Sequence, residues 1–231
     1  MKPGDIICTA VLPQDIEKGL EYALQSLPYT FDRMKYGSVT TNAHLKRLQK
    51  ITLGKCAEAV LSRFLHSHGV SHQALAGATA HTDPDRFDFR IDNKVIDLKS
   101  FAVPEKHAKA EFIANALALV PADQWRKRNR YHRFIFAFFA GELHLTLRQS
   151  LSDLLDASSR PPKREEIILK AEGARIFLTA APEISECENK FRKIHAGTRC
   201  VQYPHGTRID NMGCRISELT AFKSVVHWGG V

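Results

Sequence analysis

The sequence lacks long hydrophobic runs, and its cysteines do not form a pattern typical of disulfide-stabilised proteins. Its longest apolar stretch, Phe134 to Ala140, is far shorter than the roughly 20 residues that a transmembrane helix needs. The N-terminus, Met1-Lys2-Pro3-Gly4-Asp5, is not followed by the apolar region of a signal peptide. The 5 cysteines are odd in number and widely scattered, which favours a reducing compartment. We therefore expect a cytoplasmic protein with no membrane partner.

Acidic residues are outnumbered by basic ones. Lys and Arg total 33 against 25 for Asp and Glu, so the formal net charge is +8. A hydrophobic content of 44% over 231 residues is ordinary for a globular chain and sufficient for a full core. The basic surface favours polyanions, of which nucleic acid is the first to consider.

The first part of the chain has helical periodicity. Apolar spacing predicts a helix from Gln14 to Leu27 that Pro28 ends, and Asn42 is suited to cap a second helical region. An apolar stripe from Leu53 to Leu65 then ends before Gly69. These residues predict two amphipathic helices.

The pattern then alternates between strands and helices. Period-two alternation between Phe87 and Lys99 predicts a β-hairpin around the turn Asp92-Asn93. The remaining predicted elements are a helix over Glu105 to Leu119, strands over Tyr131 to Ala140 and Leu143 to Leu147, a strand pair near Ile167 to Thr179 and a helix from Glu183 to Ile194. A linker is expected at Ser158 to Lys163. The fold class is therefore α/β, with an N-terminal helical extension (1–41), a core (42–157) and a C-terminal α+β segment (163–231) that belongs either to the core domain or to a separate unit.

The predicted hairpin places charged side chains on one face. A two-residue turn at Asp92-Asn93 pairs Phe89 with Ile96 and sets Asp88 opposite Asp97, with Lys99 on the same face. Like charges in such a position are destabilising without a compensating cation, and paired carboxylates suit a divalent metal. The alternative is a solvated polar face with salt bridges among its own residues.

Glu58 is the third carboxylate of interest. By helical periodicity it lies about 140° from Leu53, at the margin of the apolar stripe. From there it can reach the polar face of the hairpin. Its alternative role is that of a boundary glutamate paired with a lysine.

These residues resemble the PD-(D/E)XK nuclease superfamily, which has the restriction-endonuclease-like fold. The family pattern is a helix carrying Glu, an Asp that opens a strand, and Asp or Glu, any residue and Lys on the next strand. It is matched by Gly54-Lys55-Cys56-Ala57-Glu58, Asp88-Phe89-Arg90-Ile91 and Asp97-Leu98-Lys99-Ser100. The resemblance covers about residues 50 to 147 and implies a central mixed β-sheet flanked by helices. Asp85, in the literal Pro84-Asp85 pair, is the alternative first ligand.

The resemblance implies a metal-dependent DNA endonuclease of restriction, defence or recombination type. Asp88, Asp97 and the backbone carbonyl of Leu98 would hold Mg²⁺, for which Mn²⁺ can substitute, and Glu58 would hold a second metal or the intervening water. Lys99 would orient the attacking water or stabilise charge on the phosphate.

Two basic clusters support a nucleic-acid substrate, with double-stranded DNA preferred and RNA a third choice. They consist of Lys46, Arg47, Lys50 and Lys55 near Glu58, and of Arg126, Lys127, Arg128, Arg130 and Arg133. Such residues neutralise phosphates without reading sequence. A non-catalytic nucleic-acid-binding or assembly module on the same fold is the competing hypothesis, and the sequence leaves open whether the protein acts as a homodimer.

Overall fold

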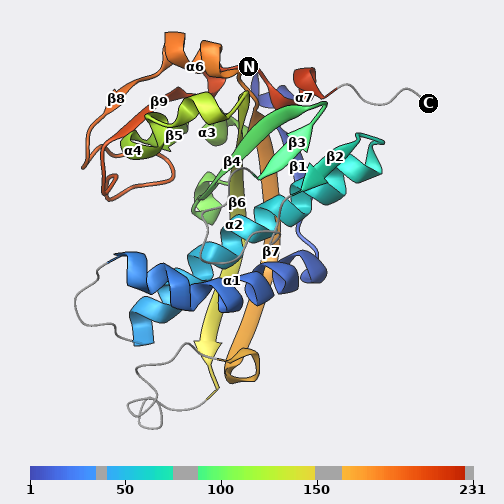
Figure 1. Ribbon diagram of the computed structural model, residues 1–231, viewed down its shortest axis with the longest axis vertical. Coiled ribbons are helices and arrows are strands. Elements are labelled where there is room, and N and C mark those ends of the chain that lie inside the picture. The colour runs from blue at the N-terminus through green and yellow to red at the C-terminus, as the bar shows by residue number, and fades with distance from the viewer. Residues whose placement is uncertain (35–40, 75–87, 149–162, 227–231) are drawn as a thin grey trace.

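The computed structural model describes residues 1–34, 41–74, 88–148 and 163–226. Asp85, Phe87 and the predicted linker up to residue 162 lie outside these residues. Within them, a curled six-stranded sheet is flanked by helices, and a smaller three-stranded sheet packs beside it (Figure 1). The α/β class predicted from the sequence is therefore confirmed.

The large sheet is mixed. Its strands are β1 (Ile7–Ala10), β2 (His72–Ala74), β3 (Phe89–Ile91), β4 (Lys94–Ala102), β6 (Arg133–Leu147) and β7 (Ile167–Ala180). Their order is β1-β7-β6-β4-β3-β2. The β4–β6 pair is parallel and the other pairs are antiparallel. The N-terminal region therefore contributes a strand as well as a helix, and β7 from the C-terminal segment lies between β1 and β6 in the same sheet.

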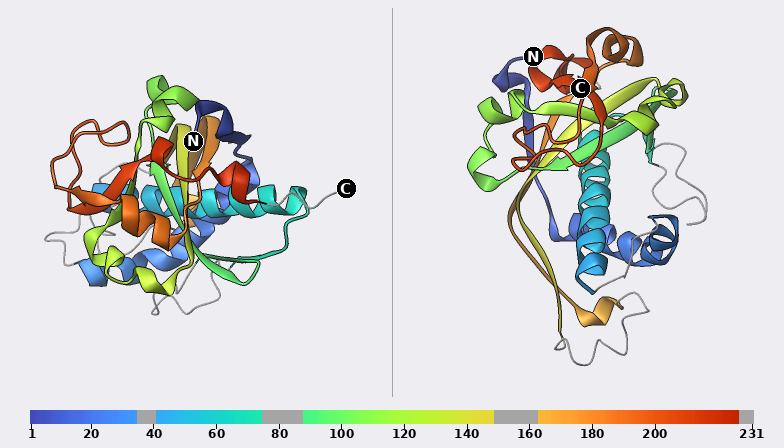
Figure 2. Two further views of the ribbon diagram at one scale, coloured as in Figure 1. Left: turned by 90° about the horizontal axis from the view of Figure 1, so that it is seen from above. Right: turned by 90° about the vertical axis from the view of Figure 1, so that its left-hand side faces the viewer.

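Two long helices cover one face of this sheet (Figure 1, Figure 2). They are α1 (Pro13–Met34) and α2 (Thr41–Ser67). The predicted stripe is correct, because Ala57, Val60 and Leu61 of α2 are fully buried in the core beneath this face. The predicted stop at Pro28 is wrong, since α1 continues to Met34. Proline disfavours a helix interior but does not forbid one when neighbouring elements support it.

An ion pair between a half-buried arginine and a buried carboxylate joins the two helices. Arg63 Nη2 lies 2.8 Å from Asp15 Oδ2, and the same carboxylate oxygen accepts a hydrogen bond from the Leu12 backbone N–H at 2.9 Å. Asp15 is buried. Because the carboxylate has both a cation and an N–H donor, its burial is compensated.

The predicted hairpin is present with the predicted register. Phe89 pairs with Ile96 and Ile91 with Lys94, and both turn residues have positive φ, 48° at Asp92 and 59° at Asn93. Two successive left-handed residues define the turn whose twist suits a tight hairpin. The pattern of Asp-Asn between alternating residues therefore located this element correctly.

The predicted strand pair around Gly141 is instead one continuous strand. β6 runs from Arg133 to Leu147 and pairs with β7 through a β-bulge near Gly141, whose φ is +104°. A Cβ at this position would lie 2.7 Å from Cα of Ala174. The glycine permits a bulge and a close approach of two strands rather than a chain reversal. The long β6–β7 ribbon extends beyond the rest of the sheet (Figure 1).

Two predicted helices are shorter in the structure, and part of each segment forms a strand of the second sheet. This sheet consists of β5 (Leu117–Pro121), β9 (Asn211–Arg215) and β8 (Arg192–Ile194). The predicted helix over 105–119 therefore shortens to η2 (Glu105–His107) and α3 (Ala110–Ala114), followed by a strand. The predicted helix over 183–194 shortens to α6 (Ile184–Lys190). Pairing with β9, which is distant from β5 in the chain, outweighs the local helical spacing.

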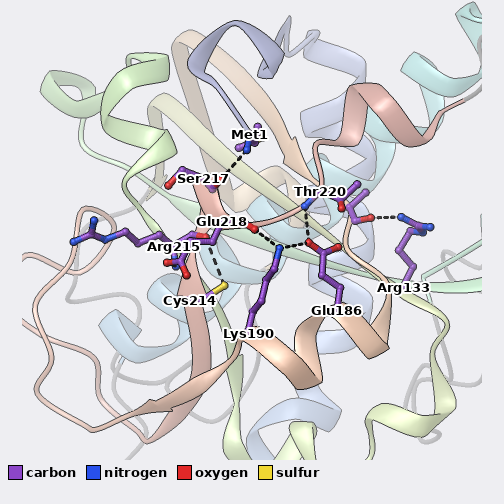
Figure 3. A network of polar contacts seen from close by, with 10 residues as sticks. Met1, Arg133, Glu186, Lys190, Cys214, Arg215, Ser217, Glu218 and Thr220 are labelled. Atoms are coloured by element: carbon purple, nitrogen blue, oxygen red, sulfur yellow. Dashed lines mark hydrogen bonds and ion pairs between the residues drawn. The ribbon is translucent and has the colours of Figure 1, made fainter.

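Short elements complete the fold. They are η1 (Pro3–Asp5), α4 (Ala122–Trp125), η3 (Arg128–Arg130), η4 (Arg164–Glu166), η5 (Ile216–Glu218) and α7 (Phe222–Val225). A polar network joins α6 to the C-terminal elements (Figure 3): Lys190 Nζ donates to Glu186 Oε1 at 2.9 Å and to the Glu218 carbonyl. The Met1 ammonium group donates to the Ser217 carbonyl at 2.7 Å. The N-terminus and α6 are thereby both joined to η5, the short element that follows β9.

Candidate functional site

Asp88 lies at the point where β3 begins. The paired residues of β3 and β4 start at Phe89, and the Asp88 backbone N–H donates to the Ile96 carbonyl at 3.2 Å. Its carboxylate Oδ2 accepts a hydrogen bond from the Leu98 backbone N–H at 2.7 Å. The sequence predicts Asp88 in the ladder opposite Asp97, but in the structure Asp88 lies just before the paired residues of β3. Its carboxylate is instead held against the part of β4 that carries Asp97-Leu98-Lys99.

Negative charge gathers around Asp88. The pKa of its carboxyl is raised well above the usual range, first by burial and then by the carboxylates of Glu58 and Asp97. The hydrogen bond from Leu98 and the charge of Lys55 oppose this rise only in part. The charges of Glu58 and Asp97 therefore both disfavour ionisation of Asp88.

Asp97 and Lys99 form a close pair on β4. Lys99 Nζ lies 2.6 Å from Asp97 Oδ2, but the angle is outside hydrogen-bonding geometry. This buried oxygen therefore has an ionic contact and no hydrogen bond. Lys99 Nζ also donates to Gln124 Oε1 at 2.9 Å and lies 5.9 Å from the centre of the Phe134 ring. As predicted from strand alternation, the two residues point to the same side.

Glu58 approaches Asp88 from a different direction. Ile96 and Leu98 face the core beneath α2, so the alternating side chains of Asp97 and Lys99 point away from that helix. Glu58 is on α2, is 9% exposed, and lies 2.9 Å from Lys55 Nζ. It lines a pocket of about 460 Å³ between α1, α2 and β2. Glu58 therefore lies on the α2 side of the sheet, whereas Asp97 and Lys99 point to the other side.

The carboxylates of Asp88, Asp97 and Glu58 are of a type that suits a hard divalent cation, but they are not arranged as a metal site. Asp88, Asp97 and Glu58 supply carboxylate oxygens of the kind that Mg²⁺ binds, and Asp97 has a buried oxygen without a hydrogen bond. Within the described residues, however, no three His, Cys, Asp or Glu side chains form a group that could hold a metal ion. Two carboxylates and a backbone carbonyl would suffice for Mg²⁺, which retains most of its waters.

The predicted DNA-binding cations divide into exposed and structural residues. Lys46, Lys50, Arg126, Lys127 and Arg130 are exposed. Arg128 is half-buried, pairs with Glu188 at 2.7 Å and lies over the Trp125 ring. Arg47 and Lys55 are half-buried, and the latter pairs with Glu58.

Arg133 has a structural position that does not suit the predicted contact with DNA. It is 7% exposed and donates hydrogen bonds to the Ala181 carbonyl and, at 2.8 Å, to the Glu183 carboxylate. Burial lowers its pKa, and the charge of Glu183 acts in the opposite direction. These contacts fasten the start of β6 to the chain after β7.

The arginine-rich segment nevertheless ends beside the acidic cluster. The pKa of Tyr131 is raised to about 12, first by burial and then by the charges of Asp97 and Asp88. Tyr131 also packs against Phe134, with ring centroids 5.7 Å apart. The exposed cations of this segment are therefore near the candidate site.

A groove of about 830 Å³ opens beside Lys99, and sequence reasoning did not identify it. Its walls come from α2, β4, β5, α4 and a loop between β8 and β9, here called the 195–210 loop. The neighbouring aromatic and basic residues Tyr203, His205 and Arg208 were the available signal. Nothing local in the sequence links that signal to Lys99.

All 5 cysteines are free, as their scatter predicted. In the part of the chain that the structure describes, no helix is both long and apolar enough to cross a bilayer.

Comparisons with known proteins found no matching family model, no matching curated protein and no matching solved structure.

Proposed function

We propose that the protein is a metal-dependent DNA endonuclease that hydrolyses phosphodiester bonds. The observation that carries this proposal is the position of buried Asp88, which is hydrogen-bonded to β4 at Leu98 and whose pKa is raised by burial and by the charges of Glu58 and Asp97. Concentrated buried negative charge beside a lysine is costly to a folded protein. Such a cost is characteristic of sites that bind a cation or perform acid–base chemistry.

Each residue has a role that follows from its surroundings. Asp88 and Asp97, with the Leu98 carbonyl, would hold Mg²⁺, and Glu58 would complete the acidic set. The ion, when bound, would supply an acidified water and positive charge against the phosphate. Lys99 would hold a proton beside the phosphate and stabilise its developing charge, since its neighbours Asp97 and Gln124 keep the ammonium group in place.

A non-catalytic nucleic-acid-binding module is the second candidate, and one observation favours it. Lys99 is paired with Asp97 at 2.6 Å and Lys55 with Glu58 at 2.9 Å. Each of these acids therefore has a lysine that neutralises it without a metal. A module of this kind would bind DNA equally well with and without Mg²⁺.

Plasmid nicking tests the proposal. Supercoiled, single-stranded and branched DNA are incubated with the protein in Mg²⁺ or in EDTA, beside Lys99→Met and Lys94→Met variants. Lys94 is the matched control, because it lies on the same strand and is exposed at the far end near Glu183. We expect Mg²⁺-dependent cleavage that Lys99→Met removes and Lys94→Met retains. Absence of metal-dependent cleavage on every substrate would favour the binding module.

A further inference from the structure

The groove beside Lys99 has several cations in its lining, of which Lys99 is paired with Asp97 at 2.6 Å. Its lining includes Lys50, Lys99, His205 and Arg208, and none of the described residues that line it is Asp or Glu. Burial, then the charges of Arg208 and Arg47, lower the pKa of Lys50. Cations from α2 and from the 195–210 loop therefore repel one another across the groove. A polyanion lying between them would relieve this repulsion.

The same groove presents aromatic rings. Tyr203 is 40% exposed, and its ring stands edge-on to Phe101, with centroids 6.4 Å apart and an interplanar angle of 86°. Both residues line the groove. Aromatic faces next to cations form a stacking surface for nucleic-acid bases. Duplex DNA keeps its base faces covered, so only unpaired bases can use this surface.

The loop that carries Tyr203 is held in place rather than loosely attached. Gln202 Nε2 donates to the Leu117 carbonyl at 2.6 Å, and the Thr207 N–H donates to the Thr198 carbonyl at 2.9 Å. Gly206 has a φ of +96°, and a Cβ there would lie 2.6 Å from the Gly197 carbonyl oxygen. A side chain at this position would open the loop. The ring and cations are therefore positioned before any ligand arrives, which lowers the entropic cost of binding.

From this combination we infer that the groove binds single-stranded DNA, with an unpaired base stacked on Tyr203 and phosphates beside Lys50 and Arg208. The inference deepens the proposed function and rests on it in one respect, namely that the bound strand leads to Lys99. It also assigns a role to the C-terminal segment, which supplies one wall of the groove.

Fluorescence anisotropy with a labelled oligothymidylate of about 12 nucleotides, in EDTA, tests the inference without requiring cleavage. Tyr203→Ala is expected to weaken binding by about 5- to 150-fold, the range for loss of one stacked base. Tyr203→Phe should stay within about twofold of the wild type, because the ring is retained. A duplex of the same length should bind without sensitivity to Tyr203→Ala.

The phosphate contact is tested separately. Arg208→Gln should reduce the slope of log affinity against log salt by about 0.7, the contribution of one phosphate on a single strand. Lys170→Gln is the matched control, because Lys170 is an exposed cation on the distant β6–β7 ribbon, and it should leave the slope unchanged. Thermal unfolding of each variant confirms that it is folded.

The outcomes separate this inference from the proposed function. Loss of binding in Tyr203→Ala, together with an absence of nicking, would retain the groove and refute the endonuclease. Mg²⁺-dependent nicking, together with unchanged oligothymidylate binding in Tyr203→Ala, would retain the endonuclease and overturn the inference. Tighter binding of oligouridylate than of oligothymidylate would also overturn it, since RNA would then be the occupant.

Discussion

Replacing Asp88 by Asn removes one negative charge from the acidic cluster while keeping its shape. The Asn side-chain oxygen can still accept the hydrogen bond that the carboxylate accepts from the Leu98 N–H at 2.7 Å. Stability and function should therefore respond in opposite directions. We expect the variant to be more stable than the wild type at neutral pH and to lack metal-dependent nicking.

The expected gain is worked from the charge repulsion and the Leu98 hydrogen bond, and relief from burying the Asp88 charge adds to it. Unit charges 4 Å apart repel by about 4 kcal/mol at an effective dielectric constant of 20. Two carboxylates about 8–16 Å away would then cost about 1–2 kcal/mol each. Against this, a neutral acceptor weakens the Leu98 hydrogen bond by about 1 kcal/mol. The balance is a stabilisation of about 1–3 kcal/mol, or a rise in Tm of about 2–12 °C for a chain of this size.

The gain should depend on pH in a defined direction. The pKa of Asp88 is raised in the folded protein, so above about pH 4, the usual pKa of an aspartate, the folded wild type binds more protons than the unfolded chain. The wild type therefore loses stability as pH rises from about 4 towards the folded pKa, and the Asn variant does not share this loss. Below about pH 4 the carboxyl is protonated in both states and the two proteins should be equally stable.

Thermal unfolding in EDTA, followed by circular dichroism between about pH 4 and pH 8, measures the difference. Asp92→Asn is the matched control, because it makes the same substitution at an exposed position in the turn of the same hairpin. An Asp88→Asn variant that is less stable than the wild type by the same amount at every pH would refute the reasoning, since the loss of the hydrogen bond would then outweigh the relief of repulsion.

Three further predictions concern the framework of the site. Arg133→Met should lower the free energy of unfolding by about 1–3 kcal/mol in denaturant titrations, because the buried Ala181 carbonyl loses its donor. DNA affinity at low temperature should stay near the wild-type value. A specific loss of affinity in the folded variant would mean that Arg133 contacts DNA after all. Gly141→Ala should lower the free energy of unfolding by about 1–3 kcal/mol, because Gly141 has a positive φ and lies close to the neighbouring strand. Gly4→Ala is the control and should change stability little, because there is open space around Gly4. Equal effects of the two substitutions would exclude the bulge as the cause. In the native protein at neutral pH, an alkylating reagent should modify exposed Cys8 and not buried Cys56, because burial raises the pKa of the Cys56 thiol to about 12. Mass spectrometry that finds both cysteines modified before unfolding would contradict this packing.

The errors in the elements predicted from sequence have a common cause. The strand over Leu117–Pro121 follows directly on a segment with helical spacing, yet it pairs with β9, 90 to 98 residues along the chain. The sequence predicts two strands on either side of Gly141 because glycine favours turns, but pairing with β7 makes Arg133–Leu147 one bulged strand. Long-range pairing decided both cases, and no local pattern records it.

The candidate site shows the same division. Glu58, Asp88, Asp97 and Lys99 could be selected from the sequence because helix and strand periodicities assign each side chain to a face. That Asp88 leaves the ladder to bond with Leu98 could not be predicted from periodicity. Neither could the burial of Arg133, which reads as one more cation in a basic run.

The sequence by itself determined what depends on neighbours a few residues away: the stripe of α2, the Asp92-Asn93 turn with its register, the excess of basic charge and the unpaired cysteines. Only the tertiary structure decided which distant segments share a surface. It inserted β7 between β1 and β6, and it brought the 195–210 loop beside Lys99. The physical reason is that turn and helix preferences act over a few residues, whereas sheet pairing and groove formation depend on burying surfaces contributed by segments far apart in the chain.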